Sequence, residues 1–504
     1  MKGVPVKGTL FSYSMRRFSH TEMQSRIVSI LAVLLFSLFL RAAERPWSHG
    51  DLKVADNGLY LQHSDGTPFF WLGDTGWLLP QRLDRDEAQH YLEQTAREGY
   101  NVVQIQVLNG VPSFNRYGAM SNPDGWKLAV ASKPGEYGYW EHLDHIVDTA
   151  ERNGIYIGMV CIWGGLVKGG LLNEEQAREY GRFLADRYKD KPNIIWIIGG
   201  DIQGDVKTEV WDTLARSIKA NDPSHLMTFH PRGRTTSARW FADRDWLDFH
   251  MFQSGHRRYG QRMGNKDYPI PDNTEEDTWM YVDSVRKYQP VRPVLDGEPS
   301  YENIPQGLHG ADEPLWNDRD VRRYAYWSVF AGSFGHTYGH NNIMQFIRPG
   351  LPGAYFADGI AKPWYVAIDD PGRCQMKYLK RLLLSFPFFD RIADQSVVID
   401  NGEKYDRIIA TRGKDYLFAY NHTGRPIMLD LSRISGREKE LWTMDPTDGS
   451  LTYLGKTNER ILSHTPEPGP DIVLIAFDAS RGYLTPGMKE IPERKAEEIK
   501  DLTE

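Results

Sequence analysis

The sequence Asn193-Ile-Ile-Trp-Ile-Ile-Gly-Gly-Asp201 predicts a strand that is buried on both faces and ends in a carboxylate. A short apolar run bounded by Asn and Gly is typical of a parallel sheet covered by helices on both sides. Seven other segments of the chain share this character and are rich in Val, Ile, Phe and Trp. The eight expected strands are 69–73, 101–108, 155–163, 193–199, 226–230, 247–252, 291–297 and 334–339.

Segments with helical periodicity lie between these strands. The first, 84–99, has acidic residues in its first turn and ends at Gly99, as start and stop signals of a helix require. The expected helices are 84–99, 139–153, 173–188, 210–220, 278–288, 318–331 and 375–386. Alternation of strand and helix predicts a parallel sheet, and eight units predict closure into a (β/α)8 (TIM) barrel. An open doubly wound sheet is the rival fold, but no Gly-rich phosphate fingerprint follows an early strand.

The pattern changes after residue 390. Short strand candidates now follow one another without helices, and turn signals such as Asp400-Asn-Gly separate them. This predicts a small antiparallel β-sandwich over 391–480, after a catalytic domain at 44–390, and a charged tail at 481–504. Few Trp residues occur in the sandwich, so we expect it to brace the barrel. Its expected strands are 397–399, 407–410, 416–420, 427–431, 439–443, 461–463 and 472–477.

The N-terminal segment predicts export. Residues 27–40 are apolar except for Ser29 and Ser37, and three arginines precede them. The run has the length of a signal-peptide core and is too short to span a bilayer comfortably. We therefore expect a signal peptide at 1–43, with an upstream extension if translation starts at Met15 or Met23. The mature protein would be periplasmic or secreted, without a stable membrane span.

Composition excludes several classes of protein. The formal net charge of −7, with no basic block, argues against a nucleic-acid partner. Two cysteines, Cys161 and Cys374, are too few for a disulfide framework or a Cys-based zinc site. A metallohydrolase barrel would need a His-x-His pair at its first strand, and a serine hydrolase a Gly-x-Ser-x-Gly turn. Neither motif is present, so no metal and no cofactor is expected.

Two carboxylates close opposite strands of the expected barrel. Asp201 follows the fourth strand and Glu298 follows the seventh. Active sites of such barrels lie at the carboxyl ends of the strands, and glycosidic cleavage needs one carboxylic acid and one carboxylate on either side of the scissile bond. A single strand-end carboxylate more often caps a helix or joins a salt bridge. The pairing at these two positions favours catalysis.

Further polar and aromatic residues lie at the other strand ends. Sugar recognition needs several hydrogen-bonding groups together with an aromatic surface. A lone histidine is more often structural, and Asp74 could also cap a helix. The expected substrate-binding residues are Asp74, Asn109, Trp163, His230, His250, Gln253, Tyr301 and His340.

Four segments carry a resemblance to a known family. They are 59–77, which includes Trp-Leu-Gly-Asp-Thr-Gly-Trp77, then 99–106, Ile197-Ile-Gly-Gly-Asp201, and Leu295-Asp-Gly-Glu-Pro-Ser-Tyr-Glu302. The chain there resembles the apiosidase-like glycoside hydrolases, family 140, which have a (β/α)8 domain and attack apiose linkages in the pectin rhamnogalacturonan II. The resemblance implies Asp201 as acid/base and Glu298 as nucleophile. Residues 441–449 resemble a small β-domain named for collagen binding, a label that implies nothing about collagen here.

The sequence thus predicts an exported glycosidase that acts on a plant cell-wall polysaccharide or oligosaccharide, at an apiosyl linkage and with retention. Two alternatives stay open. One is a glycosidase of the same fold with another substrate, such as an arabinosidase or an endo-glucanase. The other is a non-catalytic carbohydrate-binding protein on the same barrel.

Overall fold

The computed structural model describes residues 45–128, 136–261, 276–308, 313–348, 350 and 362–488. Chain contacts divide the protein into a unit Met1–Ser48 and a unit His49–Glu504, and the second unit contains both the predicted barrel and the predicted β-domain. The expected signal peptide and residues 489–504 of the expected tail lie outside the described residues. Within the described part of the chain, no helix has both the length and the apolar character needed to cross a membrane.

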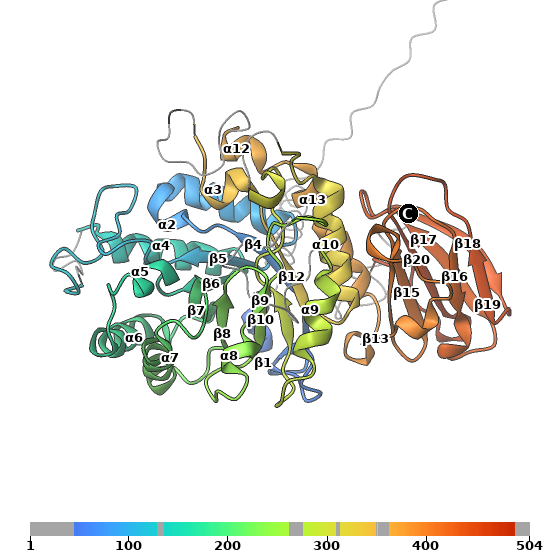
Figure 1. Ribbon diagram of the computed structural model, residues 1–504, viewed down its shortest axis with the longest axis horizontal. Coiled ribbons are helices and arrows are strands. Elements are labelled where there is room, and N and C mark those ends of the chain that lie inside the picture. Colours follow the sequence, from blue (N-terminus) through green and yellow to red (C-terminus); the bar gives the residue numbers. More distant parts are fainter. Residues whose placement is uncertain are drawn as a thin grey trace, which may run out of the picture. The chain divides into compact units, whose positions relative to one another are not determined.

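Eight mostly parallel strands form a nearly closed barrel (Figure 1). All eight predicted strands are confirmed, although most are shorter than expected because a strand ends where its backbone pairing ends. The order in the sheet is β8-β7-β6-β5-β4-β12-β11-β10-β9, with β9 (Thr235–Thr236) antiparallel to β10. The barrel strands are β4 (Trp71–Thr75), β5 (Val102–Gln106), β6 (Tyr156–Val160), β7 (Ile194–Ile202), β8 (Met227–Pro231), β10 (His250–Gln253), β11 (Val294–Asp296) and β12 (Gly335–Tyr338).

The first and last barrel strands, β4 and β12, pair in parallel, so the sheet returns on itself. The remaining seam lies between β8 and β10. There the Asp248 N–H donates to the Met227 carbonyl at 2.9 Å. The Thr228 hydroxyl donates to the Phe249 carbonyl at 2.7 Å. These two bonds replace a regular ladder and complete the wall of the barrel.

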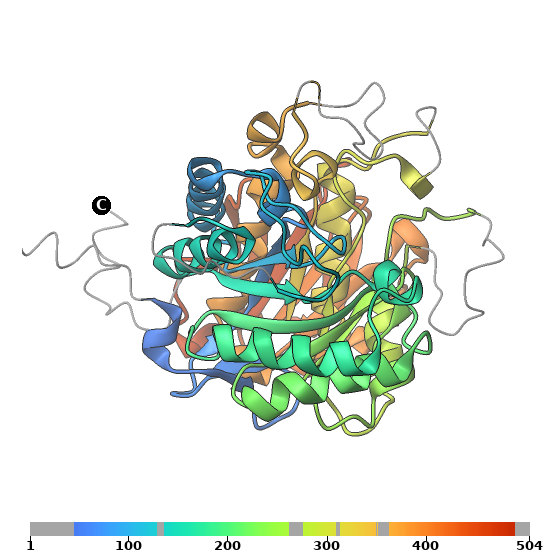
Figure 2. The ribbon, with the colours of Figure 1, turned by 90° about the vertical axis from the view of Figure 1, so that its left-hand side faces the viewer.

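Helices cover the outside of the barrel, and Figure 2 shows α6 and α7 side by side across its face. The seven predicted helices are confirmed. The first follows a capping box in which Asp84 and Glu87 each accept the other's backbone N–H at 3.0 Å. The helices are α3 (Arg85–Arg97), α4 (Tyr139–Arg152), α6 (Glu174–Tyr188), α7 (Thr208–Asn221), α9 (Thr278–Val285), α10 (Asp318–Phe330) and α13 (Pro371–Leu384).

Several short elements were not predicted, because each is only a few residues long and carries no periodic pattern. An antiparallel sheet of three short strands precedes the barrel, and five single-turn helices follow barrel strands or lie in loops. They are β1 (Leu52–Val54), β2 (Leu61–His63), β3 (Pro68–Phe69), α2 (Leu79–Arg82), α5 (Gly164–Lys168), α8 (Ala238–Phe241), α11 (Asn341–Met344) and α12 (Trp364–Ala367).

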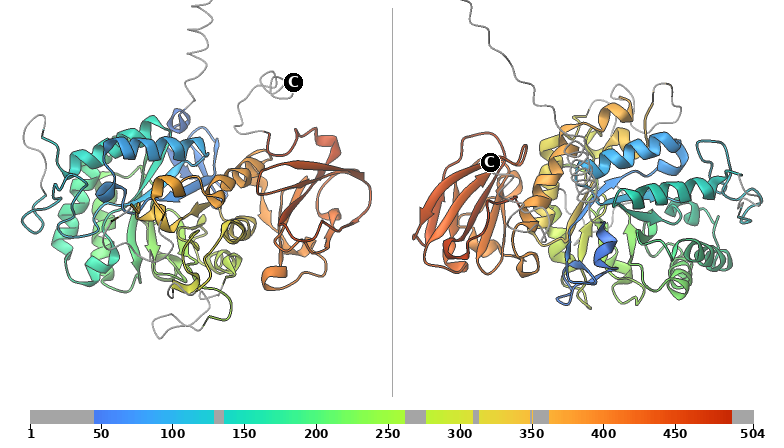
Figure 3. Two further views of the ribbon diagram at one scale, coloured as in Figure 1. Left: turned by 90° about the horizontal axis from the view of Figure 1, so that it is seen from above. Right: turned by 180° about the vertical axis from the view of Figure 1, so that it is seen from behind.

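The C-terminal region is an antiparallel β-domain, as predicted, drawn in orange to red in Figure 3. Its larger sheet has the order β13-β14-β15-β20-β17-β18, and β16 pairs with β19 in a second sheet. The strands are β13 (Ile392–Ala393), β14 (Ile408–Arg412), β15 (Tyr416–Asn421), β16 (Ile427–Asp430), β17 (Lys439–Met444), β18 (Leu451–Thr457), β19 (Ile461–His464) and β20 (Ile472–Asp478).

Two details of this β-domain differ from expectation. The predicted strand 397–399 is wrong: a 3-10 turn, η4 (Gln395–Val397), leads into a single bridge between Val398 and Leu429. Strand β18 was missed because most of its side chains face water, which removes the apolar signal of a strand.

A buried ion pair joins α10 of the barrel to the β-domain. Arg322 donates to the two oxygens of Asp471 at 2.9 and 2.8 Å, and both side chains are almost fully buried. The Tyr420 hydroxyl also donates to Asp471, at 2.8 Å. Its ring stacks on Tyr326, with centroids 4.5 Å apart. These contacts join the barrel to the β-domain through buried polar groups; the bracing role of the β-domain stays a prediction.

Candidate active site

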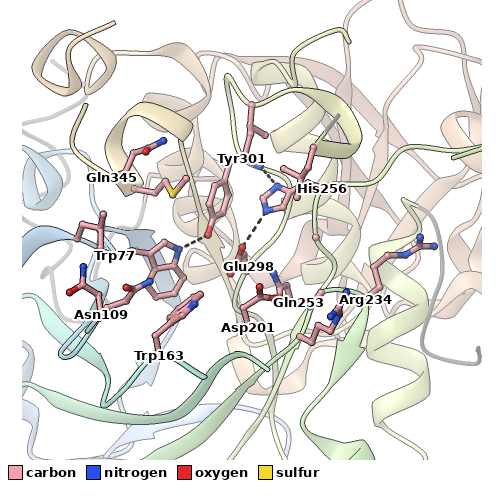
Figure 4. A pocket seen from close by; sticks show the side chains of 18 of the residues that line it. Trp77, Asn109, Trp163, Asp201, Arg234, Gln253, His256, Glu298, Tyr301 and Gln345 are labelled. Atoms are coloured by element: carbon pink, nitrogen blue, oxygen red, sulfur yellow. Dashed lines mark hydrogen bonds and ion pairs between the residues drawn. The ribbon is translucent and has the colours of Figure 1, made fainter. Parts of the chain in front are cut away.

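A pocket of about 600 Å³ opens at the carboxyl ends of the barrel strands. Both predicted catalytic residues, Asp201 and Glu298, line it, and Figure 4 shows their carboxylates side by side at its centre. Trp77 and Trp163 stand on one side, and His256 on the other. The strand ends thus converge as the barrel topology requires.

The end of β7 is bent so that Asp201 enters the pocket. Gly199, Gly200 and Asp201 have φ values of 91°, 111° and 46°, and the pairing with β8 is irregular between Gly199 and Ile202. A Cβ on Gly199 would lie 2.6 Å from the His230 carbonyl. A Cβ on Gly200 would lie 2.8 Å from the Trp163 ring. Only glycine fits both positions, so the Gly-Gly pair is what places the carboxylate.

Glu298 follows β11 and is held by two histidines. His256 Nε2 lies 3.2 Å from Oε1, and His230 Nε2 lies 3.2 Å from Oε2. The N–H of Gly255 donates to the Glu298 carbonyl at 3.0 Å, which fixes the backbone as well. The carboxylate therefore has a hydrogen-bond donor, His256, at Oε1 and a close imidazole contact, His230, at Oε2.

Backbone groups determine which nitrogen of each histidine carries the proton. His230 Nδ1 accepts from the Asp201 N–H at 3.2 Å, and His256 Nδ1 accepts from the Tyr301 N–H at 3.4 Å. A neutral imidazole has one acceptor and one donor nitrogen. Nε2 therefore carries the proton in both rings. The His256 Nε2–H is directed at Glu298 Oε1, and His230 Nε2 lies close to Oε2.

The two carboxylates differ in charge. Burial alone would raise the pKa of Glu298, but hydrogen bonds and charge interactions with His230 and His256 outweigh it and lower the pKa to about 2. Loss of hydration inside the pocket, followed by repulsion from the charge of Glu298, raises the pKa of Asp201 to about 6. At mildly acidic pH the pocket thus holds one ionised carboxylate beside one protonated carboxylic acid.

An aromatic wall stands beside the carboxylates. Trp77 Nε1 donates to the Tyr301 hydroxyl at 2.9 Å. The Trp77 and Trp163 rings lie 5.6 Å apart at an angle of 60°, and Trp77 also meets the His230 ring edge-on at 5.4 Å. Such faces suit the apolar C–H surfaces of a sugar ring.

Five of the eight expected binding residues lie in or next to the pocket. Asn109, Trp163, Gln253 and Tyr301 line it. His230 is fully buried behind it and contacts Glu298. His230 therefore supports the Glu298 carboxylate from behind the pocket.

The other three expected binding residues lie elsewhere, and their predicted role is wrong. Asp74 points out of the barrel, where it pairs with Arg373 at 3.2 Å and accepts from the Tyr91 hydroxyl at 2.9 Å. His250 starts β10 and so lies at the opposite end of the strand from the pocket, next to Ser237. His340 caps α11 and pairs with Asp370 at 2.7 Å.

Several pocket residues were not predicted from the sequence. Trp77 and His256 lie two to three residues beyond a strand end, where the apolar pattern of the strand no longer marks a position. Arg232 and Arg234 follow β8 directly after His230, and that spacing could have revealed them. With Arg82 and Arg257, four arginines line the pocket against two carboxylates.

No cluster of His, Cys, Asp or Glu suited to a metal ion occurs among the described residues. Cys161 is a free cysteine and is buried. The carboxylates that line the pocket are those of Asp201 and Glu298.

Comparison with known proteins gives two matching families. Residues 55–390 match the family described as "Apiosidase-like, catalytic domain". Residues 392–476 match the "Putative collagen-binding domain of a collagenase". The search of curated proteins gave no match.

Two solved structures are similar over most of the chain. One, described as a glycoside hydrolase, is 60% identical, with a TM-score of 0.85, over 88% of this chain and 100% of the other. The second, described as a glycoside hydrolase family 5 protein from Bacteroides vulgatus, is 59% identical, also with a TM-score of 0.85, over 88% of this chain and 96% of the other.

Proposed function

Because the chain belongs to the apiosidase-like glycoside hydrolases, we propose that it cleaves an apiosyl linkage of the pectin rhamnogalacturonan II with retention of configuration. Membership of the family makes the protein an enzyme, which sets aside the non-catalytic alternative. The observation that carries the mechanism is the opposite shift of the two carboxyl pKa values, down for Glu298 and up for Asp201.

In the first step Glu298 attacks the anomeric carbon of the sugar. One carboxylate oxygen forms a bond to that carbon while the bond to the glycosidic oxygen breaks. Asp201 gives its proton to the departing oxygen, which leaves as an alcohol. The two histidines keep Glu298 ionised and hold the orientation of its carboxylate. The charge on Glu298 helps to keep Asp201 protonated.

In the second step Asp201, now a carboxylate, takes a proton from water. The hydroxide formed in this way attacks the anomeric carbon, the bond to Glu298 breaks, and the sugar leaves. A carboxylate with a pKa of about 2 is a poor general base, so Glu298 is better suited to nucleophilic attack than to activating a water. This supports retention over inversion.

The charge of the pocket supports an acidic substrate. Arg82, Arg232, Arg234 and Arg257 line the pocket of a protein whose formal net charge is −7. Guanidinium groups bind carboxylates in a fork geometry. Rhamnogalacturonan carries uronic acid carboxylates, whereas arabinan and glucan are neutral, so the arginines favour pectin over the substrates of an arabinosidase or an endo-glucanase.

The catalytic roles are tested by Asp201→Asn and Glu298→Gln, assayed for sugar release from rhamnogalacturonan II. We expect each change to lower kcat by about 10³-fold or more, because each removes a group that takes part in bond making or breaking. Asp86→Asn, on the exposed face of α3, is the control and should keep wild-type turnover. Near-wild-type turnover of either pocket variant would contradict the assignment.

The substrate is tested separately by product analysis. Wild-type protein is incubated with rhamnogalacturonan II, arabinan and a β-glucan, and released sugars are identified by chromatography. Release of apiose from the first alone is the expected result. Release of arabinose or gluco-oligosaccharides instead would replace the proposed substrate without changing the enzyme class.

We also propose that the protein acts outside the cytoplasm. The apolar run at 27–40, preceded by arginines, supports this. N-terminal sequencing of protein expressed from the full gene in a bacterial host should find a mature chain that begins near residue 44 in the extracytoplasmic fraction.

A further inference from the structure

The loop that follows β10 carries three pocket residues, Gly255, His256 and Arg257. Its beginning is fixed by the barrel itself. The Gly255 N–H donates to the Glu298 carbonyl at 3.0 Å, and Ser300 donates to the Gly255 carbonyl at 2.8 Å. The His256 carbonyl accepts from Trp316 Nε1 at 3.2 Å.

The next part of the loop is fixed by Glu276. The Tyr259 N–H donates to Glu276 Oε1 at 2.7 Å, and the Tyr259 hydroxyl donates to Asp277 at 2.6 Å. Glu276 is fully buried and pairs with the equally buried Arg323 of α10. Tyr259, only three residues beyond His256, is therefore attached to a rigid and charged support.

The β-domain shares this support. Tyr405, in the turn η5 (Lys404–Asp406), donates its hydroxyl to the same Glu276 Oε1 at 2.8 Å. Its ring meets the Tyr259 ring edge-on at 5.0 Å and lies 4.8 Å from the Arg323 guanidinium. Lys404 completes the contact, with its ammonium 5.1 Å from the Tyr259 ring.

We propose that Tyr405 of the β-domain is a positioning residue for glycoside cleavage, which through Glu276 and Tyr259 holds the loop that brings His256 to Glu298. The inference rests on the proposed roles of Glu298 and His256. The β-domain then does more than brace the barrel from outside, since it contributes to the geometry of the active site without touching the substrate.

The physical reason is that the donor geometry at Glu298 is sensitive to small shifts. His256 donates at 3.2 Å, close to the long end for such a bond, so a displacement of a few tenths of an ångström weakens it. The loss of one donor raises the pKa of Glu298, whose other titratable neighbours are His230, Asp201, Asp296 and Tyr301. The loss of this donor also makes the orientation of the Glu298 carboxylate less well defined.

The test compares Tyr405→Phe with Tyr453→Phe. The first keeps the ring contacts and removes only the hydroxyl donated to Glu276. The second removes an exposed hydroxyl on β18 of the same β-domain and is the matched control. On rhamnogalacturonan II we expect Tyr405→Phe to lower kcat about three- to tenfold with KM within about twofold, and to lose activity between pH 5 and pH 3.5, where the wild type keeps it. Tyr453→Phe should match the wild type.

Hydrogen exchange of the substrate-free enzyme provides a readout that does not depend on activity. Tyr405→Phe should speed exchange in residues 254–261 and Tyr453→Phe should not, with the melting temperatures of both above the assay temperature. Unchanged exchange in this loop together with an unchanged pH profile would overturn the inference. If the wild type cleaves none of the substrates tested, the proposed substrate fails, and exchange in the loop alone then decides the positioning role.

Discussion

At the scale of single residues, Glu298 and Asp201 show how two carboxyl groups in one pocket acquire different protonation states. Glu298 has two imidazoles in contact with its carboxylate, each held by a backbone N–H, whereas Asp201 accepts a long bond of 3.4 Å from the Gly233 N–H. After desolvation, the charge of Glu298 is the next largest cause that raises the pKa of Asp201. The two therefore titrate as a pair.

This pair predicts the pH dependence of the reaction. The first step needs a protonated Asp201, and the pKa of that residue is about 6. Raising the pH through 6 removes the proton, so kcat/KM should fall about tenfold per pH unit above that value. The measurement is kcat/KM between pH 4 and pH 8 on rhamnogalacturonan II. A rate that stays constant up to pH 8 would contradict the role of Asp201 as the acid.

At the scale of elements, the sequence contained enough to predict the eight barrel strands and seven helices, because long apolar runs and capping residues are local signals. Side-chain direction at the strand ends was harder to predict. Asp74 lies at a carboxyl end like Asp201, yet it points outward to Arg373. The difference comes from backbone geometry: β7 bends at two glycines with positive φ, and β4 does not.

The bend in β7 can be tested with a matched pair of glycine substitutions. Gly200→Ala adds a methyl group 2.8 Å from the Trp163 ring at φ 111°, whereas Gly170→Ala meets nothing within 4 Å at φ 80°. We expect Gly170→Ala to cost about 1 kcal/mol of backbone strain and to keep full activity. Gly200→Ala should cost about 3 kcal/mol or more and abolish turnover. Urea unfolding and sugar release measure both, and equal behaviour of the two variants would show that the bend is not needed.

His256 shows that the ends of predicted strands do not identify every residue of an active site. It lies three residues past β10, on a loop whose course depends on Glu276, Arg323 and Tyr405. These residues are far apart in sequence, and no local pattern connects them. The catalytic pair was within reach of sequence reasoning because Asp201 lies in β7 and Glu298 just after β11, in two motifs that also carry the family resemblance. Its supporting groups come from long-range contacts.

At the scale of the whole molecule, the barrel and the β-domain share buried charges. Arg322 and Asp471 are 3% and 1% exposed at their side chains, while the pair of Asp430 with Arg460 lies at the surface, with Arg460 73% exposed. Breaking a buried pair leaves an uncompensated charge in a low-dielectric environment, and breaking a surface pair does not.

The two pairs predict different costs for the same chemical change. Asp471→Asn should lower the free energy of unfolding by about 3 kcal/mol, because the buried Arg322 loses its buried counter-charge and keeps the partly exposed Asp318 as an ionic partner. Asp430→Asn should cost about 1 kcal/mol or less. Denaturant titration of both variants gives the values. Equal costs would mean that the interface between barrel and β-domain contributes little to stability.

Helix α10 also links the order of synthesis to the order of folding. Arg322 belongs to the wall of the barrel, but its partner Asp471 lies about 150 positions later and near the end of the chain. While the ribosome is still making the β-domain, Arg322 of α10 faces the place where that domain will dock, and its ionic partner on the same helix is the partly exposed Asp318. The outer wall of the barrel is therefore completed only after the chain is released, and a fragment that stops after α13 would remain incomplete even though every barrel strand is present.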